Sequence, residues 1–172
     1  YAMIPSFIYS GYYWASIAAS TAALLTSFVF FYFLIRDLKN HRDLIKPWFL
    51  AGLFFAVISS VGVFGLSYMM SSGNMTQNLY LSATYYYLHF QYNGFFIFSC
   101  IGFLLLSLKE IGAEISEKEN KMIFWLMFVS CIIGFGLSVL WMKMPLWIFI
   151  AIILATVAQT VGSVKLYLLI KR

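Results

Sequence analysis

Five long apolar segments restrict what this 172-residue chain can fold into. They run over residues 12–35, 47–70, 79–108, 122–142 and 146–170. Each is long enough to cross a hydrocarbon core of roughly 30 Å, which takes about 20 helical residues. None shows the alternation of a β-strand, and a transmembrane barrel would need many shorter segments. The sequence therefore predicts an all-α, polytopic transmembrane helix bundle of five spans, forming one domain over residues 1–172.

Composition agrees with a membrane protein. Hydrophobic residues make up 63% of the chain and charged residues only 10%, whereas a soluble domain carries about 25% charged residues. We therefore expect the lipid bilayer and other membrane helices or subunits as partners. The net charge of +5 comes from basic residues at the ends of apolar segments, which is typical of membrane topology and argues against nucleic-acid binding.

The distribution of basic residues predicts the orientation. Nine Lys and Arg residues follow the first, third and fifth segments: Arg36, Lys39, Arg42, Lys46, Lys109, Lys118, Lys121, Lys171 and Arg172. The alternate loops contain only Lys143. Because cytoplasmic loops are enriched in Lys and Arg, we expect the N-terminus outside and the C-terminus in the cytoplasm, as in a bacterial cytoplasmic (inner) membrane.

The two ends of the sequence look cut. The chain begins at Tyr1 instead of Met and ends at Arg172, directly after an apolar run. This pattern indicates either a removed N-terminal signal or a piece of a longer chain. We favour the piece.

Few polar side chains interrupt the apolar segments. All six acidic residues lie in the two predicted cytoplasmic loops, and buried carboxylates are what proton-coupled carriers usually need. We therefore expect neither such a carrier nor a catalytic residue. Lys165 is interpreted as reaching the cytoplasmic headgroups with its long stem, or as binding an anionic lipid or substrate. Gln159 is predicted to form hydrogen bonds between helices, and Gln91 is a further polar group inside a segment.

His89 is the main candidate for function, within the stretch "ATYYYLHFQYNGFFIF" (residues 83–98). It lies ten residues into the third segment, which is roughly 15 Å along a helix and near the middle of a bilayer. Spacings of three and four residues put four polar or aromatic residues on its side of the helix: Tyr85, Tyr86, Tyr92 and Asn93. The same face would continue through Phe96 to Cys100.

Three roles for His89 stay open. It could be a neutral histidine bonded to a tyrosine hydroxyl or to a backbone carbonyl of another helix. It could ligate a metal or haem, with the tyrosines and Asn93 supporting the ligand. It could also line a pocket for a quinone or another aromatic ligand. His41 lies in a loop at the wrong depth for a second haem ligand, and the cysteines lie outside metal-binding motifs. Haem or copper would therefore need ligands from elsewhere.

The residues "YYYLHFQYNGFF" (85–96) resemble the sixth helix of the catalytic subunits of the haem-copper oxidase superfamily, notably the nitric oxide reductase branch. In that family the aromatic-rich helix carries a metal-ligating His, a Glu four residues later and a Gly five residues later. Here these positions are His89, Asn93 and Gly94. Residues 122–142 lack the two adjacent histidines of the family's next helix. The resemblance implies His89 as a metal ligand supported by Asn93, and it does not extend to catalysis.

Our leading functional prediction is a degenerate or partial haem-copper oxidase-like subunit, associated with respiration or redox chemistry and without a catalytic site of its own. One alternative is a transporter or ligand-binding protein with a pocket around His89. Another is a scaffold or assembly subunit of a membrane complex. For this chain alone we favour the absence of enzymatic activity.

Overall fold

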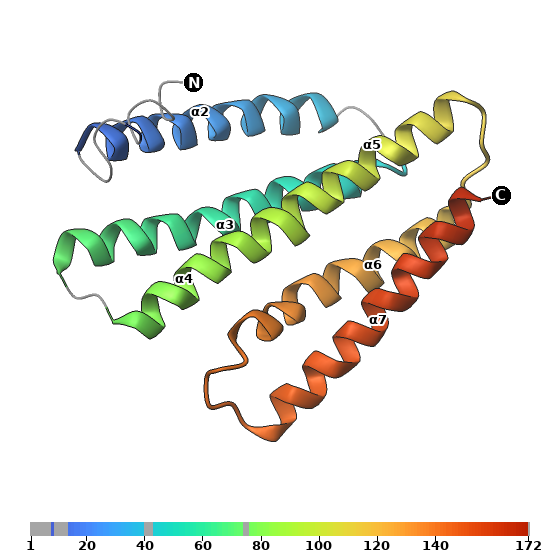
Figure 1. The fold of residues 1–172 in the computed structure, drawn as a ribbon. Coiled ribbons are helices and arrows are strands. Elements are labelled where there is room, and N and C mark those ends of the chain that lie inside the picture. Colours follow the sequence, from blue (N-terminus) through green and yellow to red (C-terminus); the bar gives the residue numbers. More distant parts are fainter. Residues whose placement is uncertain (1–7, 9–13, 40–42, 74–75, 172) are drawn as a thin grey trace. The chain divides into compact units, whose positions relative to one another are not determined.

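The computed structural model describes residue 8 and residues 14–39, 43–73 and 76–171 (Figure 1). All regular structure in these ranges is helical: α2 (Trp14–Lys39), α3 (Lys46–Ser72), α4 (Gln77–His89), the π-helix η1 (Phe90–Phe96), α5 (Ile97–Glu110), α6 (Glu117–Gly134), the 3-10 helix η2 (Phe135–Val139) and α7 (Leu146–Ile170). The elements α4, η1 and α5 form one continuous helix, as do α6 and η2. Five helices are thus long and apolar enough to cross a membrane, which confirms the predicted all-helical class.

The chain divides into two units, residues 1–42 and residues 43–172. The first unit contains α2, whose most apolar stretch has no fully buried residue. The hydroxyls of Thr21, Thr26 and Ser27 each bond to the backbone carbonyl four residues earlier. The helix therefore satisfies these polar groups itself, and its apolar side chains are exposed or half-buried.

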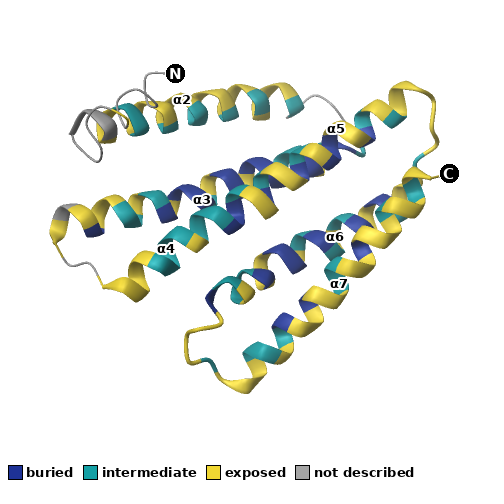
Figure 2. Ribbon diagram, in the orientation of Figure 1, coloured by how far each residue is buried: buried dark blue, intermediate teal, exposed yellow. Residues whose placement is uncertain are grey.

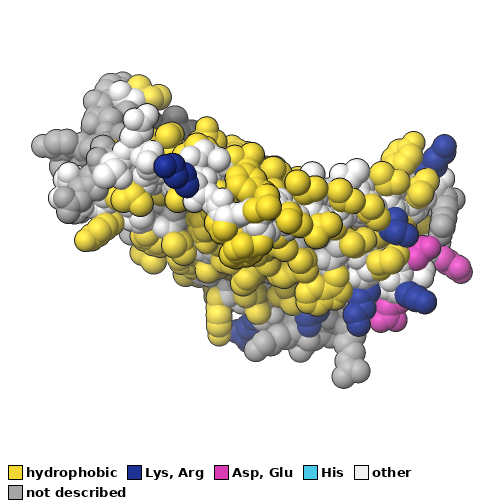
Figure 3. All heavy atoms as spheres, turned by 90° about the horizontal axis from the view of Figure 1, so that it is seen from below, with side chains coloured by type: hydrophobic (Ala, Val, Ile, Leu, Met, Phe, Trp, Pro, Cys, Tyr) yellow, Lys and Arg dark blue, Asp and Glu magenta, His cyan; other side chains and the backbone are white. Residues whose placement is uncertain are grey.

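The second unit is built around α3, which contacts α4, η1, α5 and α6. Phe55 of α3 is fully buried, and its ring centroid lies 5.2–5.8 Å from those of Phe90, Phe98 and Phe128. Figure 2 shows the buried positions concentrated on α3, α5 and α6, while α7, which pairs with α6, is mostly exposed. Hydrophobic side chains cover most of the face in Figure 3.

Two glycines let α3 lie close to its neighbouring helix. A Cβ at Gly62 would lie 2.7 Å from the Ala83 carbonyl oxygen of α4. A Cβ at Gly94 of η1 would lie 2.5 Å from the Cβ and Cγ of Phe55. Such distances leave no room for a side chain, so glycine is needed at both positions for the helices to pack as they do.

The connection between α5 and α6 is shorter than the charged loop predicted between the apolar segments 79–108 and 122–142. Gly112 has a φ of 85°, and its amide bonds to the Lys109 carbonyl while the Ala113 amide bonds to the Leu108 carbonyl, both at 3.0 Å. This is a Schellman motif, which requires a left-handed residue and favours glycine. The next helix begins at Glu117, ahead of the expected Met122, because acidic residues in a first turn interact favourably with the helix dipole.

Asn120 ties the start of α6 to the start of α3. Its Oδ1 accepts a hydrogen bond of 2.9 Å from the indole Nε1 of Trp48, and its Nδ2 donates a bond of 2.8 Å to the Leu44 carbonyl. Both Asn120 and Trp48 are buried. One amide thus satisfies a donor and an acceptor that would otherwise be unpaired in the interior.

We expect Asn120→Ala to lower the free energy of unfolding by about 1–2 kcal/mol, because it leaves the Trp48 indole N–H and the Leu44 carbonyl without this partner. Thermal unfolding in detergent micelles measures the effect. The control is Asn78→Ala at an exposed position of α4. Equal stability of the two variants would contradict the role of Asn120.

A salt bridge lies near the same end of α3. The Nζ of Lys109 is 2.8 Å from Oδ2 of Asp43. The Lys109 hydrogen bond holds the pKa of Asp43 below its ordinary value, helped by the Lys109 charge and the backbone amides of Ile45 and Leu44, while partial burial opposes the shift. Because the pKa is lower in the folded state, the pair stabilises the fold above the unfolded pKa of roughly 3.9 and loses this effect as the pH falls through the folded pKa.

We therefore expect Asp43→Asn to cost less than about 1 kcal/mol at pH 7, as for other solvent-accessible pairs. The difference from the wild-type protein should close as the pH falls below about 4. Unfolding midpoints at pH 7 and pH 3 test this, with the exposed Glu114→Gln as the control. A difference that is the same at both pH values would show that the ion pair is not its cause.

Candidate functional site

His89 is the last residue of α4 and is 9% exposed. Its Nε2 lies 2.9 Å from the backbone carbonyl oxygen of Cys131 in α6. A carbonyl can only accept a hydrogen bond, so Nε2 carries the proton in this contact and Nδ1 is left with a lone pair. The amide Nδ2 of Asn93 lies 3.2 Å from Nδ1, and the Ser138 hydroxyl lies 3.5 Å from it. Both ring nitrogens of a neutral imidazole are therefore engaged by groups of the protein.

The Cys131 carbonyl is available because α6 changes form one turn later. In an α-helix this carbonyl would accept the amide of Phe135. At Gly134 the α-helix gives way to η2, and the Phe135 amide bonds to the Ile133 carbonyl instead. The change from α-helix to 3-10 helix thus frees an acceptor that His89 then satisfies. It also brings Ser138 close to the imidazole.

The π-helix η1 begins directly after His89. Its hydrogen bonds span five residues, as in the bond from the Ile97 amide to the Tyr92 carbonyl, so the helix makes a wider turn. Downstream of it, Phe98 is 1% exposed and faces the core. Tyr92 and Phe96 are instead 59% and 55% exposed, and Cys100 is exposed too. The predicted continuation of the His89 face through these three residues requires an unbroken α-helix, and the π-helix η1 interrupts it.

The two tyrosines before His89 lie in different surroundings. Tyr86 is partly buried, and its ring packs against Phe90 and Phe135 at centroid distances of 4.8 and 5.2 Å. Tyr85 is 41% exposed and packs 5.2 Å from the ring of Trp141. Neither tyrosine is hydrogen-bonded to His89, whose partners are a carbonyl, an amide and a hydroxyl.

The remaining polar candidates lie at three places. The Oε1 of Gln91 is 2.8 Å from the hydroxyl of Ser59, which joins η1 to α3. Gln159 of α7 lies near the same point of α6 as His89, since a Cβ at Gly134 would lie 3.9 Å from Gln159 Oε1 and 3.9 Å from His89 Cε1. Lys165 is exposed on α7. His41 lies outside the described residues.

Sequence reasoning missed several partners in these contacts, namely Ser59, Asn120, Ser138 and the Cys131 carbonyl. A backbone carbonyl leaves no mark in a sequence. The one available signal was the pair Gly134 and Gly136, since glycines near the end of a helical segment lower the expectation of a regular helix.

The donor set around His89 does not fit copper by itself. It offers one imidazole, one amide and one hydroxyl, whereas copper sites in proteins use several imidazole or sulfur ligands. One imidazole can hold a haem, but it must then have a free nitrogen. Among the residues that the structure describes, no group of three or more His, Cys, Asp or Glu could hold a metal ion. A metal at Nδ1 would have to displace the contacts with Asn93 and Ser138. The role of His89 as a metal ligand therefore stays a prediction that depends on ligands from elsewhere.

The site thus brings side chains of four elements close to the Cys131 carbonyl of α6. His89 ends α4, Asn93 lies in η1, Ser138 lies in η2, and Gln159 approaches from α7. All four side chains are uncharged hydrogen-bonding groups, if His89 is the neutral form required by its contacts. We compared the chain with protein-family models, curated proteins and solved structures, and none matches it.

Proposed function

We propose that the chain is a membrane-embedded scaffold subunit of five spans, in which His89 joins helices and does not carry chemistry. The observation that supports this role most directly is the engagement of both imidazole nitrogens by groups of the protein itself. A metal-bound histidine must keep one nitrogen clear of protein donors so that the metal can occupy it. This one uses Nε2 to connect α4 to α6 and Nδ1 to hold η1.

The same use of polar groups recurs elsewhere in the second unit. Gln91 joins η1 to α3 through Ser59, and Asn120 joins α6 to α3 through Trp48. Without water, an unpaired polar group costs several kcal/mol, so each pair has a strong preference for the closed arrangement. Hydrogen bonds between helices therefore account for the buried His89 and the half-buried Gln91, two polar side chains of the third segment.

The proposed partners are lipids and other membrane subunits. Large apolar side chains are exposed on several helices, as with Phe64 of α3, Phe103 of α5 and Leu154 of α7. In a bilayer these side chains would contact acyl chains or other helices at no cost. The basic residues predict an N-terminus outside and a C-terminus in the cytoplasm of a bacterial inner membrane.

Cysteine accessibility tests the membrane arrangement. In a Cys100→Ala, Cys131→Ala background, we expect Met144→Cys between α6 and α7 to react with a membrane-impermeant maleimide in right-side-out vesicles. Ala113→Cys between α5 and α6 should react only after the vesicles are permeabilised. The opposite pattern would reverse the proposed orientation, and labelling of both sites in sealed vesicles would contradict the spanning of α6 and η2.

The redox-associated version of the proposal, in which the chain is a haem-copper oxidase-like subunit, needs a partner that supplies metal ligands. Its test is absorption spectroscopy and metal analysis of the protein purified with its partners. A Soret band or stoichiometric copper or iron that is lost in His89→Ala would replace the scaffold role. Absence of these signals from the purified complex would remove the metal version.

A ligand-binding or transport role is favoured by one specific observation. The helix irregularities η1 and η2 meet at His89, and π-helical turns often occur at functional sites. The test compares a candidate ligand's binding and the unfolding midpoint in His89→Ala. Loss of stability with unchanged binding would favour the scaffold role.

A further inference from the structure

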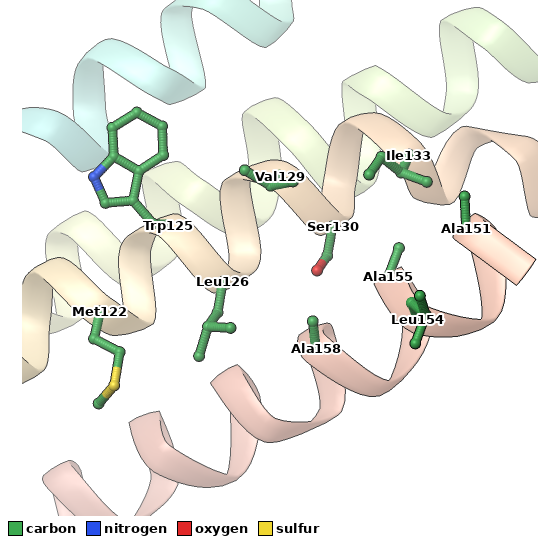
Figure 4. Close-up of a pocket in the computed structure, with 10 residues that line it drawn as sticks. All are labelled: Met122, Trp125, Leu126, Val129, Ser130, Ile133, Ala151, Leu154, Ala155 and Ala158. Carbon is green, nitrogen blue, oxygen red and sulfur yellow. The ribbon is translucent and has the colours of Figure 1, made fainter.

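A groove between α6 and α7 lies apart from the contacts described so far. It has a volume of about 570 Å³ and is largely open to the surroundings. Trp125, Val129 and Ser130 line it on α6 (Figure 4). The α7 wall consists largely of small residues, Ala155 and Ala158 among them, and these create the space because they reach only a short way toward α6.

Ser130 is the one polar residue of this lining. Its side chain points into the space between the two helices (Figure 4), although the residue as a whole is only 1% exposed. Its hydroxyl forms no hydrogen bond within the described part of the chain. Two hydroxyls of α7 outside this lining behave differently, since Thr156 and Thr160 each bond to the backbone carbonyl four residues earlier at 2.9 Å.

The Ser130 oxygen is reachable from the groove, because Asp43 Oδ1 is the one fully buried side-chain polar atom without a partner in the described part of the chain. A hydroxyl that faces apolar surroundings without a partner is unfavourable, and native proteins usually satisfy such groups. We propose that the groove binds an uncharged, lipid-soluble small molecule whose single oxygen forms a hydrogen bond with Ser130. The volume lies within the range of roughly 300–1,000 Å³ that is usual for small-molecule sites. The apolar walls exclude a charged ligand, because nothing in them would compensate the charge.

The depth of Ser130 argues against an ordinary phospholipid, and this step rests on the proposed membrane arrangement. Ser130 lies eight residues beyond Met122, where the apolar part of α6 begins, or roughly 12 Å along the helix. Phospholipid ester groups stay near the headgroups, and an acyl chain has no oxygen to offer. A small amphiphile that dissolves in the hydrocarbon core can bring its oxygen to this depth.

Photolabelling of the purified protein in detergent micelles tests the proposal. The probe is a long-chain ketone that carries an alkyl diazirine, and labelled peptides are identified by mass spectrometry. We expect saturable labelling of α6 and α7 along the groove. The competitor 2-dodecanone should displace the probe at a concentration about three- to tenfold lower than its hydrocarbon counterpart dodecane, as one hydrogen bond implies.

Two variants and a control sharpen the test. Ser130→Ala should reduce competition by the ketone to the level of the alkane. Ser163→Ala should change nothing, because that exposed hydroxyl bonds to its own helix at the Gln159 carbonyl. Ala158→Phe should fill the groove and abolish saturable labelling. If that variant does not fold, the comparison of ketone and alkane on the wild-type and Ser130→Ala proteins still decides the question.

Three results would overturn the proposal. Equal competition by ketone and alkane would mean that the groove is only lipid-exposed surface, as would an unchanged result for Ser130→Ala. A dimer that Ala158→Phe dissociates would show that a second copy occupies the groove. The assay does not depend on orientation, so its failure is distinguishable from a reversed topology in the cysteine-labelling experiment.

Discussion

Gly62→Ala is expected to lower the free energy of unfolding by about 3 kcal/mol, at the upper end of the range for overpacked sites. The added methyl group would lie 2.7 Å from the Ala83 carbonyl oxygen and 2.9 Å from the Tyr87 amide nitrogen. Both are backbone atoms of α4 and cannot turn aside as a side chain can. Relief of the clash therefore requires α3 and α4 to move apart, with loss of packing along both helices.

Gly65→Ala is the matched control on the same helix. A Cβ there would lie 3.9 Å from the nearest atom, the Cβ of Ala83, which is ordinary van der Waals contact. Since alanine favours a helix by up to about 1 kcal/mol over glycine, this variant should be as stable as the wild-type protein or more so. Unfolding midpoints in micelles measure both variants. Equal effects of the two substitutions would contradict the close approach of α3 and α4.

His89→Leu is expected to cost about 2–3 kcal/mol of stability, because it leaves the buried Cys131 carbonyl without a donor and the Asn93 amide without its acceptor. Leucine fills a comparable volume, so the loss reports mainly on hydrogen bonding. The effect should appear as a lower unfolding midpoint, without any requirement for a ligand or metal.

Tyr92→Leu is the control for His89→Leu. Helical spacing places Tyr92 beside His89, but the structure has its side chain 59% exposed and in ring contact with Phe96. The substitution should change the free energy of unfolding by less than about 0.5 kcal/mol, as for other exposed positions. A loss as large as that of His89→Leu would mean that the face of the helix continues unbroken past His89.

The apolar segments were sufficient to predict the helices, since a long apolar run without strand-like alternation has few other solutions. The ends of the helices were harder to predict. The sequence predicts a charged loop that includes Glu117 and Glu119, yet these residues begin α6, because charge is compatible with a helix. The interruption between α5 and α6 comes instead from the turn at Gly112.

The candidate site was predictable only as far as one residue. His89 stands out in the sequence because a histidine in an apolar helix is rare. Its partners depend on two departures from the α-helix, η1 and η2, and neither follows from local composition. Ser138 and the Cys131 carbonyl reach His89 only because α6 changes form at Gly134. Sequence spacing could indicate the neighbours of His89 on its own helix and none on the others.

The wider turn of η1 also alters what the long helix from Gln77 to Glu110 can present to its surroundings. Successive residues of an α-helix are about 100° apart around the axis, so one extra residue in a turn rotates everything after it by about that angle. The residues before η1 and the residues after it therefore present different faces of the same long helix to their neighbours. One half directs His89 toward α6, and the other directs Phe98 and Leu105 into the core. A single unbroken helix can thus serve two sets of neighbours that a regular one would have to choose between.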